Sequence, residues 1–251
     1  MTDWKTLTHA YGEASDIPAL IEKLRTHPND TLWQDLWSRL CHQGTVYPAS
    51  YAALHALCEL ARALPPPDRL SPLMLIGAIV ASDDVHGMDH RPAEIVELLI
   101  PELRRLADES MRTQGLGPDR FVYLLQAASA FAGDLFWGRR LSDLVDGEFP
   151  GRCPGCRHEL FIVIGTHGFF VTAQEWVGSR NAKSRRNPIS RADQHDLSDG
   201  AAWLYATAIG YAQSQVALWI QHIFGTTVCP ACDHSFNVAD AIAEVYPNLR
   251  R

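Results

Sequence analysis

Apolar residues recur at steps of three and four between Asp16 and about Val145, and the breaks between these runs are short and contain Pro, Gly, Asn or Asp. Such spacing places the apolar side chains on one face of a helix. The first half of the chain is therefore predicted to be a series of helices, with Asp16 and Asn29 or Asp30 as N-terminal caps. The predicted helices cover, approximately, residues 16–27, 29–44, 48–64, 71–81, 92–111, 118–131 and 134–145.

The sequence pattern changes after Gly147. Residues His158–Ala173 are rich in β-forming residues, and a turn at Gly165–Gly168 joins two apolar runs, which predicts a hairpin. The polar interval Gly178–Gly200 is expected to be an exposed loop. Trp203–Phe224 then has the pattern of one long helix.

These patterns predict a mainly α protein with two domains. Residues 1–147 are expected to form a helical-repeat domain, because short turns between helices are typical of either a bundle or an α-solenoid. Residues 148–251 are expected to form a small β-containing module that ends in a short helix at Val238–Val245.

Two Cys-x-x-Cys motifs lie in this second half, Cys-Pro-Gly-Cys at Cys153–Cys156 and Cys-Pro-Ala-Cys at Cys229–Cys232. Each tight loop can direct two thiolates toward one point, and zinc favours a tetrahedron of such ligands. Both motifs continue with x-His and an aromatic residue, a repetition that predicts a zinc ribbon. The expected ligands of one structural Zn²⁺ are Cys153, Cys156, Cys229 and Cys232.

Four thiolates complete a tetrahedral shell, so the predicted ion has no open position for a catalytic water. Two alternatives stay open: a redox dithiol, or a labile or catalytic site in which His158 or His234 replaces a cysteine. The preferred interpretation places each histidine at the rim of its loop, hydrogen-bonded to sulfur or solvent. Structural zinc can supply about 10 to 16 kcal/mol, against a typical domain stability of about 5 to 15 kcal/mol, so the ion is expected to act as a clasp.

The composition is that of an ordinary globular protein. The chain has 251 residues, of which 47% are hydrophobic, and it contains no run of about 18 apolar residues and no signal-peptide pattern. Six cysteines are too few for a disulfide scaffold and fit a reducing compartment, so we expect a cytoplasmic protein without a membrane partner. The formal net charge of -7 favours a basic partner and argues against a general nucleic-acid binder.

One segment departs from this acidic character, because it holds five basic residues and no acid between positions 180 and 191. It could contact a phosphate backbone or become ordered on a protein partner, although a solvated loop is the simpler interpretation. The candidate partner-binding residues are Arg180, Lys183, Arg185, Arg186 and Arg191.

Two further clusters have the residue types of a chemical site. Cys41–Tyr47 puts a thiol beside an imidazole, but neighbours on a helix diverge, so we interpret it as a structural turn. The loop between two predicted helices near residue 85 has metal-like content without a recognisable metal spacing, and polar capping is the simpler interpretation. The residues of this weak candidate site are Asp83, Asp84, His86, Asp89 and His90.

The segment YGEASDIPALIEKL at Tyr11–Leu24, followed by WQDLWSRLCHQGTVYPASYAALHAL at Trp33–Leu57, resembles bacterial HEAT-like repeat proteins that carry a His-Gln-Gly-Thr turn. The resemblance covers roughly residues 11–64 and implies a HEAT-like helical stack. Stacks of this kind resemble adaptor and inhibitor scaffolds, and some related bacterial proteins look like immunity partners of secreted toxins. The four-cysteine module is a departure from that repeat pattern.

These observations favour a zinc-stabilised, non-catalytic scaffold that binds a protein partner, such as an immunity or antitoxin-like inhibitor of a toxin domain. The alternative from another class is a nucleic-acid-binding zinc-ribbon protein that uses the basic segment. A metal-dependent hydrolase that uses the Asp83–His90 loop is the third hypothesis.

Overall fold

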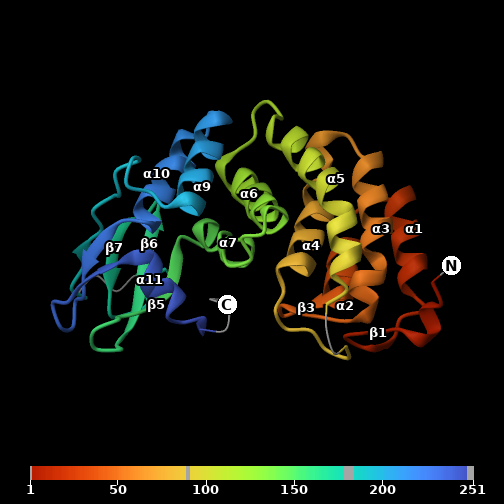
Figure 1. The fold of residues 1–251 in the computed structure, drawn as a ribbon, viewed down its shortest axis with the longest axis horizontal. Coiled ribbons are helices and arrows are strands. Elements are labelled where there is room, and N and C mark those ends of the chain that lie inside the picture. The colour runs from red at the N-terminus through yellow and green to blue at the C-terminus, as the bar shows by residue number, and fades with distance from the viewer. Residues whose placement is uncertain (1, 89–90, 178–183, 248–251) are drawn as a thin grey trace. The chain divides into compact units, whose positions relative to one another are not determined.

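The computed structural model describes residues 2–88, 91–177 and 184–247. This part of the chain is mainly α-helical with small antiparallel sheets, which confirms the predicted class (Figure 1). None of the helices in these three ranges is long and apolar enough to cross a membrane.

The chain forms two compact units. The N-terminal unit comprises Met1–Leu116 and Tyr123–Arg139, and the C-terminal unit comprises Gly117–Val122 and Arg140–Arg251. Helix α6 therefore begins in one unit and continues in the other.

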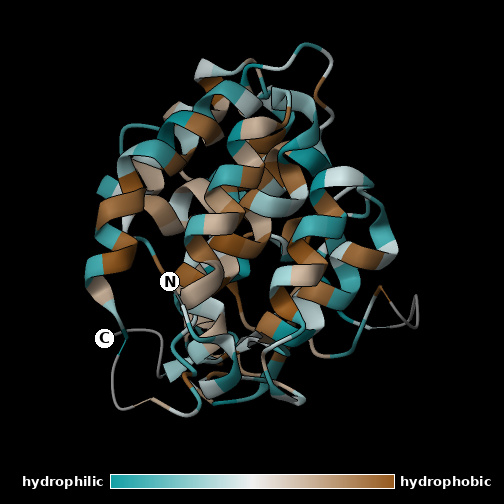
Figure 2. Ribbon diagram, turned by 90° about the vertical axis from the view of Figure 1, so that its right-hand side faces the viewer, coloured by the Kyte–Doolittle hydropathy of each residue, from teal (hydrophilic) through white to brown (hydrophobic). Residues whose placement is uncertain are grey.

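Helices with one buried face build the N-terminal unit. Hydrophilic and hydrophobic residues alternate along them (Figure 2), and α3 packs against α1, α4 and α5. The contact between α4 and α6 is close, because a Cβ added to Gly77 would lie 2.9 Å from the Cα of Ala127. The helices are α1 (Ile17–Thr26), α2 (Asp30–Leu40), α3 (Pro48–Ala63), α4 (Leu70–Ala81), α5 (Ala93–Met111), α6 (Pro118–Ala132) and α7 (Trp137–Arg140), with 3₁₀ turns at Trp4–Thr6 and Pro66–Asp68.

Local signals place several of these helices where the sequence predicts them. The side chain of Asn29 accepts a hydrogen bond from the amide of Leu32 at 3.0 Å, which caps α2. Prolines occupy the first turn of α1 and α3, where a missing N–H costs nothing.

The second predicted helix ends earlier than expected. We expected it to run to Gly44, but α2 stops at Leu40 and the chain forms a hairpin of β3 (Cys41–His42) and β4 (Thr45–Val46). Gln43 and Gly44 have φ of 51° and 90°, the left-handed values that a two-residue hairpin turn requires. The glycine thus serves a strand turn and not a helix end.

A second small hairpin precedes α1, formed by β1 (Thr8–His9) and β2 (Gly12–Glu13). The first half of the chain, predicted to be a series of helices, therefore also contains short strands. Both hairpins are only two residue pairs long, too short for the alternation of polar and apolar residues that identifies a strand.

Two predicted long helices are each divided in two. The helix expected at 134–145 consists of α7 and α8 (Asp143–Asp146), and the one expected at 203–224 consists of α9 (Asp199–Gly210) and α10 (Ser214–Ile223). Ala212, between α9 and α10, has a φ of 58°. Apolar periodicity alone does not reveal such a break, because it reports which residues are buried and not where the backbone turns.

Antiparallel strands and the remaining helices build the C-terminal unit. Its main sheet has the order β5-β6-β7-β8, and β9 pairs with β10 in a separate hairpin. The β6–β7 hairpin confirms the one predicted at residues 158–173. Helix α10 packs against β6 and α11 against β5. The bounds are β5 (Glu148–Arg152), β6 (Glu159–Gly165), β7 (Gly168–Thr172), β8 (Asn187–Pro188), β9 (Thr226–Val228), β10 (Ser235–Asn237) and α11 (Val238–Ala243).

Asp143, at the start of α8, is a buried carboxyl group with 8% of its surface exposed. Burial raises the pKa of Asp143 to about 6, although the group forms an ion pair with Arg140. The Arg140 guanidinium in turn lies 4.4 Å from the ring centroid of Tyr246.

This burial makes stability depend on pH. The folded state holds the Asp143 proton more tightly than the unfolded chain, whose pKa is near 3.8, so stability falls as the pH rises from about 4 to about 6. The decrease in the free energy of unfolding is at most about 3 kcal/mol. We expect Asp143→Asn to lack this decrease.

Urea unfolding of the wild type and Asp143→Asn across this pH range measures the effect as a difference between the two proteins. Acid-dependent loss of a bound metal would act on both proteins and cancel in that difference. A difference that does not change with pH would contradict the prediction.

Candidate metal centre

Each Cys-x-x-Cys motif lies at the tip of an antiparallel hairpin. The first loop joins β5 to β6 and follows the register pair Arg152 and Glu159. The second loop joins β9 to β10 and follows the register pair Val228 and Ser235. The strands thus fix the two ends of each loop and leave its cysteines at the tip.

The two loops have the same backbone hydrogen bonds. In the first, the amide of Cys153 donates to the carbonyl of His158 at 3.0 Å. In the second, the amide of Cys229 donates to the carbonyl of His234 at 2.9 Å. The repeated Cys-Pro-small-Cys-x-His sequence is therefore also a structural repeat, in which the carbonyl of the histidine closes the loop.

The residue after the second cysteine turns each loop back toward its strand. Arg157 and Asp233 have φ of 65° and 59°, and their amides donate to the carbonyls of Cys153 and Cys229 at 2.9 and 3.1 Å. Left-handed backbone at a residue other than glycine costs about 1 to 2 kcal/mol. Its presence at equivalent positions indicates that the shape of the loop is what both sequences preserve.

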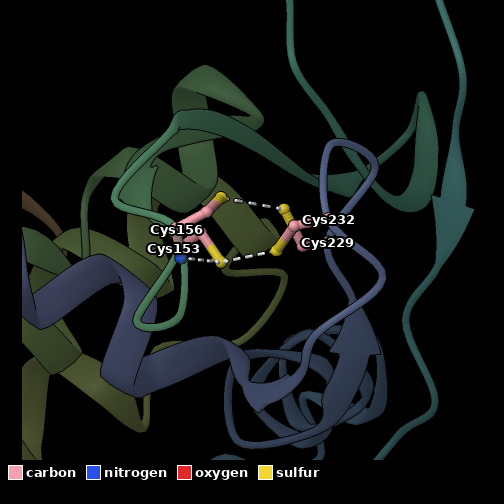
Figure 3. Close-up of side chains that lie close together, drawn as sticks. All are labelled: Cys153, Cys156, Cys229 and Cys232. Carbon is pink, nitrogen blue, oxygen red and sulfur yellow. Dashed lines mark hydrogen bonds between the residues drawn. The ribbon is translucent and has the colours of Figure 1, made fainter.

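The four cysteine sulfurs converge from the two loops, as Figure 3 shows. All four Sγ atoms lie within 4.8 Å of one another. The Sγ atoms of Cys153 and Cys232 are 3.8 Å apart, and those of Cys156 and Cys229 are 3.9 Å apart. Thiolates around a tetrahedral ion with metal–sulfur bonds of about 2.3 Å lie about 3.8 Å from each other, so this arrangement can hold a metal ion.

Burial divides the four cysteines into two kinds. Cys153 and Cys229 are buried, and Cys156 and Cys232 are exposed. The amide of Cys156 donates to the sulfur of Cys153 at 3.5 Å, and the amide of Ala231 donates to the sulfur of Cys229 at 3.4 Å. Such donors stabilise a buried thiolate.

Burial and hydrogen bonds from backbone amides have opposite effects on the pKa values of these thiols. Burial raises the pKa of Cys229 to about 12. At Cys153 burial also opposes ionisation, but hydrogen bonds from the amides of Cys156 and Gly155 outweigh it and lower the pKa to about 7. A metal must displace the thiol protons, so its affinity depends on pH.

The histidines of the two loops contribute carbonyl groups and packing. His158 and His234 are both exposed. The ring of His234 lies against Gly155, because a Cβ built on that glycine would be 2.8 Å from the Cγ of His234. A residue as small as Gly155 is thus needed at the third position of the first motif, because the His234 ring of the second loop occupies the adjacent space.

Two arginines of the basic segment contact other residues of the C-terminal unit. Arg185 forms an ion pair with Asp233 of the second loop at 2.7 Å. The guanidinium of Arg186 lies 4.3 Å from the ring of Trp176 and 5.4 Å from the ring of Phe170. Two of the predicted partner-binding arginines therefore have contacts within the protein itself.

The other predicted residues have different positions. Arg191 is exposed and lines a polar surface cavity with Tyr205 and Gln221. Four predicted site residues lie outside the described residues, namely Asp89, His90, Arg180 and Lys183.

The described residues of the 83–90 loop contact the neighbouring hairpin or α7. Asp83 forms an ion pair with Arg139, and Asp84 accepts a hydrogen bond from the hydroxyl of Thr45. The amide of His86 donates to the hairpin backbone at the carbonyl of Val46, at 2.8 Å. In the described ranges, the cysteine cluster is the one group of three or more potential ligands that comes together.

Cys41 and His42 occupy neighbouring positions of β3. Successive side chains of a strand point to opposite faces, so the thiol and imidazole do not form a catalytic pair. Burial raises the pKa of Cys41 to about 11, which keeps it protonated. The Nδ1 atom of His42 instead hydrogen-bonds the hydroxyl of Tyr11 at 3.3 Å.

No protein-family model matches this chain, and neither the curated proteins nor the solved structures include a significant match.

The contact between Gly155 and His234 predicts a sensitive position. We expect Gly155→Ala to weaken metal affinity about tenfold, which corresponds to about 1.4 kcal/mol, because the added methyl group collides with the imidazole. His234→Ala in the same chain should recover much of the loss. Competition with a chelator, with Co²⁺ as a spectroscopic probe, measures both effects.

Ala231→Gly is the matched control, because it changes the equivalent position of the other loop from methyl to hydrogen and introduces no collision. Equal affinities for Gly155→Ala and the wild type would show that the loops do not press on each other here.

Proposed function

We propose that the four cysteines bind one Zn²⁺ as a structural ion. The supporting observation is the approach of four sulfurs at the spacing of a tetrahedral thiolate site, from two loops of identical backbone pattern. Such a shell supplies no open position, so the chemistry of the ion is limited to holding its ligands together.

The sequence distance between the motifs explains what the ion would stabilise. Residues 157–228 separate the second cysteine of the first loop from the first cysteine of the other. This interval includes β6, β7, β8, α9 and α10. An ion that joins the loops would therefore hold together the two ends of a segment that makes up most of the C-terminal unit. Metal binding of this kind is folding free energy.

Wild-type protein purified without added metal should contain one zinc per chain. Cys229→Ser should lose most of the zinc and make the C-terminal unit sensitive to proteolysis, since the remaining three ligands leave a buried sulfur site incomplete. Metal analysis by mass spectrometry and limited proteolysis check the two effects.

Cys58→Ala is the control, because Cys58 is a buried free thiol of α3 in the N-terminal unit. It should retain one zinc per chain. A wild-type protein without metal, or a Cys229→Ser protein with full zinc content, would contradict the proposal.

We further propose that the chain is a non-catalytic cytoplasmic scaffold that binds a protein partner through a HEAT-like helical N-terminal unit. An immunity or antitoxin-like inhibitor that binds a toxin domain is the specific form of this proposal. Its support is the resemblance of residues 11–64, the net charge of -7 and the closed character of the cysteine centre.

An exposed and ordered aromatic residue supports a binding face at the start of the N-terminal unit. Tyr11 has 60% of its surface exposed. Its ring lies edge-on to His9 and His42 at centroid distances of 6.1 and 5.6 Å, and the guanidinium of Arg39 lies 5.9 Å from it. A preorganised tyrosine provides contact area at low entropic cost, as binding hot spots do.

The network behind Tyr11 holds this arrangement in place. Asp16 forms a hydrogen bond with His9 at 3.1 Å and an ion pair with Arg39 at 2.8 Å, and Arg39 also pairs with Asp35 at 3.0 Å. We call Tyr11, His42 and Arg39 the Tyr11 patch.

Nucleic-acid binding stays the alternative function. It is less well supported because Arg185 and Arg186 contact the protein itself and the chain is acidic overall. Nucleic acid that co-purifies, and that dissociates as salt increases or when both arginines become alanine, would favour it over the scaffold. A hydrolase based on Asp83, Asp84 and His86 has less support, since these residues contact the adjacent hairpin or Arg139.

Tyr11→Ala should reduce partner binding by about tenfold or more, because truncation of an aromatic hot spot typically costs about 2 kcal/mol. The measurement is affinity capture from the native host followed by titration of the purified partner. Tyr205→Ala, which removes a tyrosine from the C-terminal unit, should leave the affinity unchanged. Equal affinities for Tyr11→Ala and the wild type would place the binding face elsewhere.

A further inference from the structure

A cavity of about 310 Å³ lies within the N-terminal unit, where α3, α4, α5 and the C-terminal end of α6 come together. Its size falls in the range of small-molecule sites. Most of its lining is apolar, and it is independent of the cysteine cluster and of the Tyr11 patch. Its apolar lining includes Val96, Ile100 and Leu135.

Tyr51 of α3 lines this cavity and has an unsatisfied hydroxyl group. The residue is 2% exposed, and its hydroxyl has no hydrogen-bond partner within the part of the chain that the structure describes. Leaving a buried hydroxyl unpaired is unfavourable, and phenylalanine at the same position would avoid this cost. An unsatisfied buried donor calls for an explanation, and a partner bound in the adjoining cavity would supply one.

Two arginines also line the cavity, and helix ends hold both of them. Arg91 donates to the carbonyl of Val80 at 3.4 Å, at the end of α4, and Arg104 donates to the carbonyl of Phe131 at 2.9 Å, at the end of α6. Each guanidinium has five N–H donors, so these single bonds leave donors for a ligand. Glu97 is the one acidic residue of the lining in the described ranges.

Arg91 lies close enough to Tyr51 for its charge to act on the hydroxyl. Burial raises the pKa of Tyr51, and the positive charge of Arg91 opposes that increase. The lining thus combines a neutral hydroxyl donor and a cation with a mostly apolar surface. This combination matches a carboxylate, which accepts hydrogen bonds from both.

We propose that this cavity binds a small carboxylate with an apolar body, such as a medium-chain fatty acid. The carboxylate accepts hydrogen bonds from the Tyr51 hydroxyl and the Arg91 guanidinium. The apolar body lies along Val96, Ile100 and Leu135. This site does not depend on the proposed zinc clasp or on the binding of a protein partner.

Calorimetric titration with octanoate and decanoate below their micellar concentrations tests the proposal. Both acids should bind one site per chain, and the alcohols of equal length should bind at least about tenfold more weakly, because they lack the charge that Arg91 pairs with. Tyr51→Phe should weaken acid binding about tenfold and leave the melting temperature of the free protein unchanged or higher.

Arg91→Gln provides a second variant and should also weaken the acids about tenfold while it leaves the alcohols unchanged. Tyr47→Phe removes a hydroxyl at the start of the same helix, outside the cavity lining, and should bind the acids like the wild type. The proposal is overturned if neither acid binds, as expected for a cavity that holds only water. It is also overturned if both variants bind the acids like the wild type, because the acids then bind elsewhere.

Discussion

The approach of four cysteine sulfurs from two hairpins is the constraint on which the C-terminal unit depends. To bring the loops together, the 72 residues between them must form a compact structure whose two ends meet. The backbone of Gly225 packs closely against that of Ser190, because a Cβ at Gly225 would lie 2.1 Å from the carbonyl oxygen of Ser190. Ser190 and Thr226 also exchange backbone hydrogen bonds at 2.8 and 2.9 Å, so the segment before α9 returns to the strand that leads into the second loop.

A different kind of interaction holds the N-terminal unit. Its helices pack through apolar faces, and some of its polar side chains complete hydrogen bonds of loop backbone. Ser82 donates to the carbonyl of Gly44 at 2.6 Å, and the amide of Val46 donates to the carbonyl of Asp84 at 2.9 Å. The polar loop that resembled a metal site thus satisfies the backbone of a hairpin, as buried or half-buried polar groups usually do.

Two tyrosines of the N-terminal unit differ from this pattern in opposite ways. Tyr11 is ordered by its neighbours yet exposed, and Tyr51 is buried yet lacks a hydrogen-bond partner within the described residues. Each arrangement would be costly or unused in a purely structural helix stack. Together with the four-cysteine cluster, they are the features on which the proposed binding functions rest.

The sequence by itself determined the cysteine loops and most of the helices, because both depend on local spacing: a Cys-x-x-Cys turn is set by its own residues, and an amphipathic helix by the next turn. Only the tertiary structure decided where helices break, as at Ala212, and that Gly44 belongs to a hairpin. It also paired Arg185 with Asp233, 48 positions apart, and placed Tyr51 at a cavity wall built from four helices. Those features depend on residues distant in the chain, whose approach no local pattern encodes.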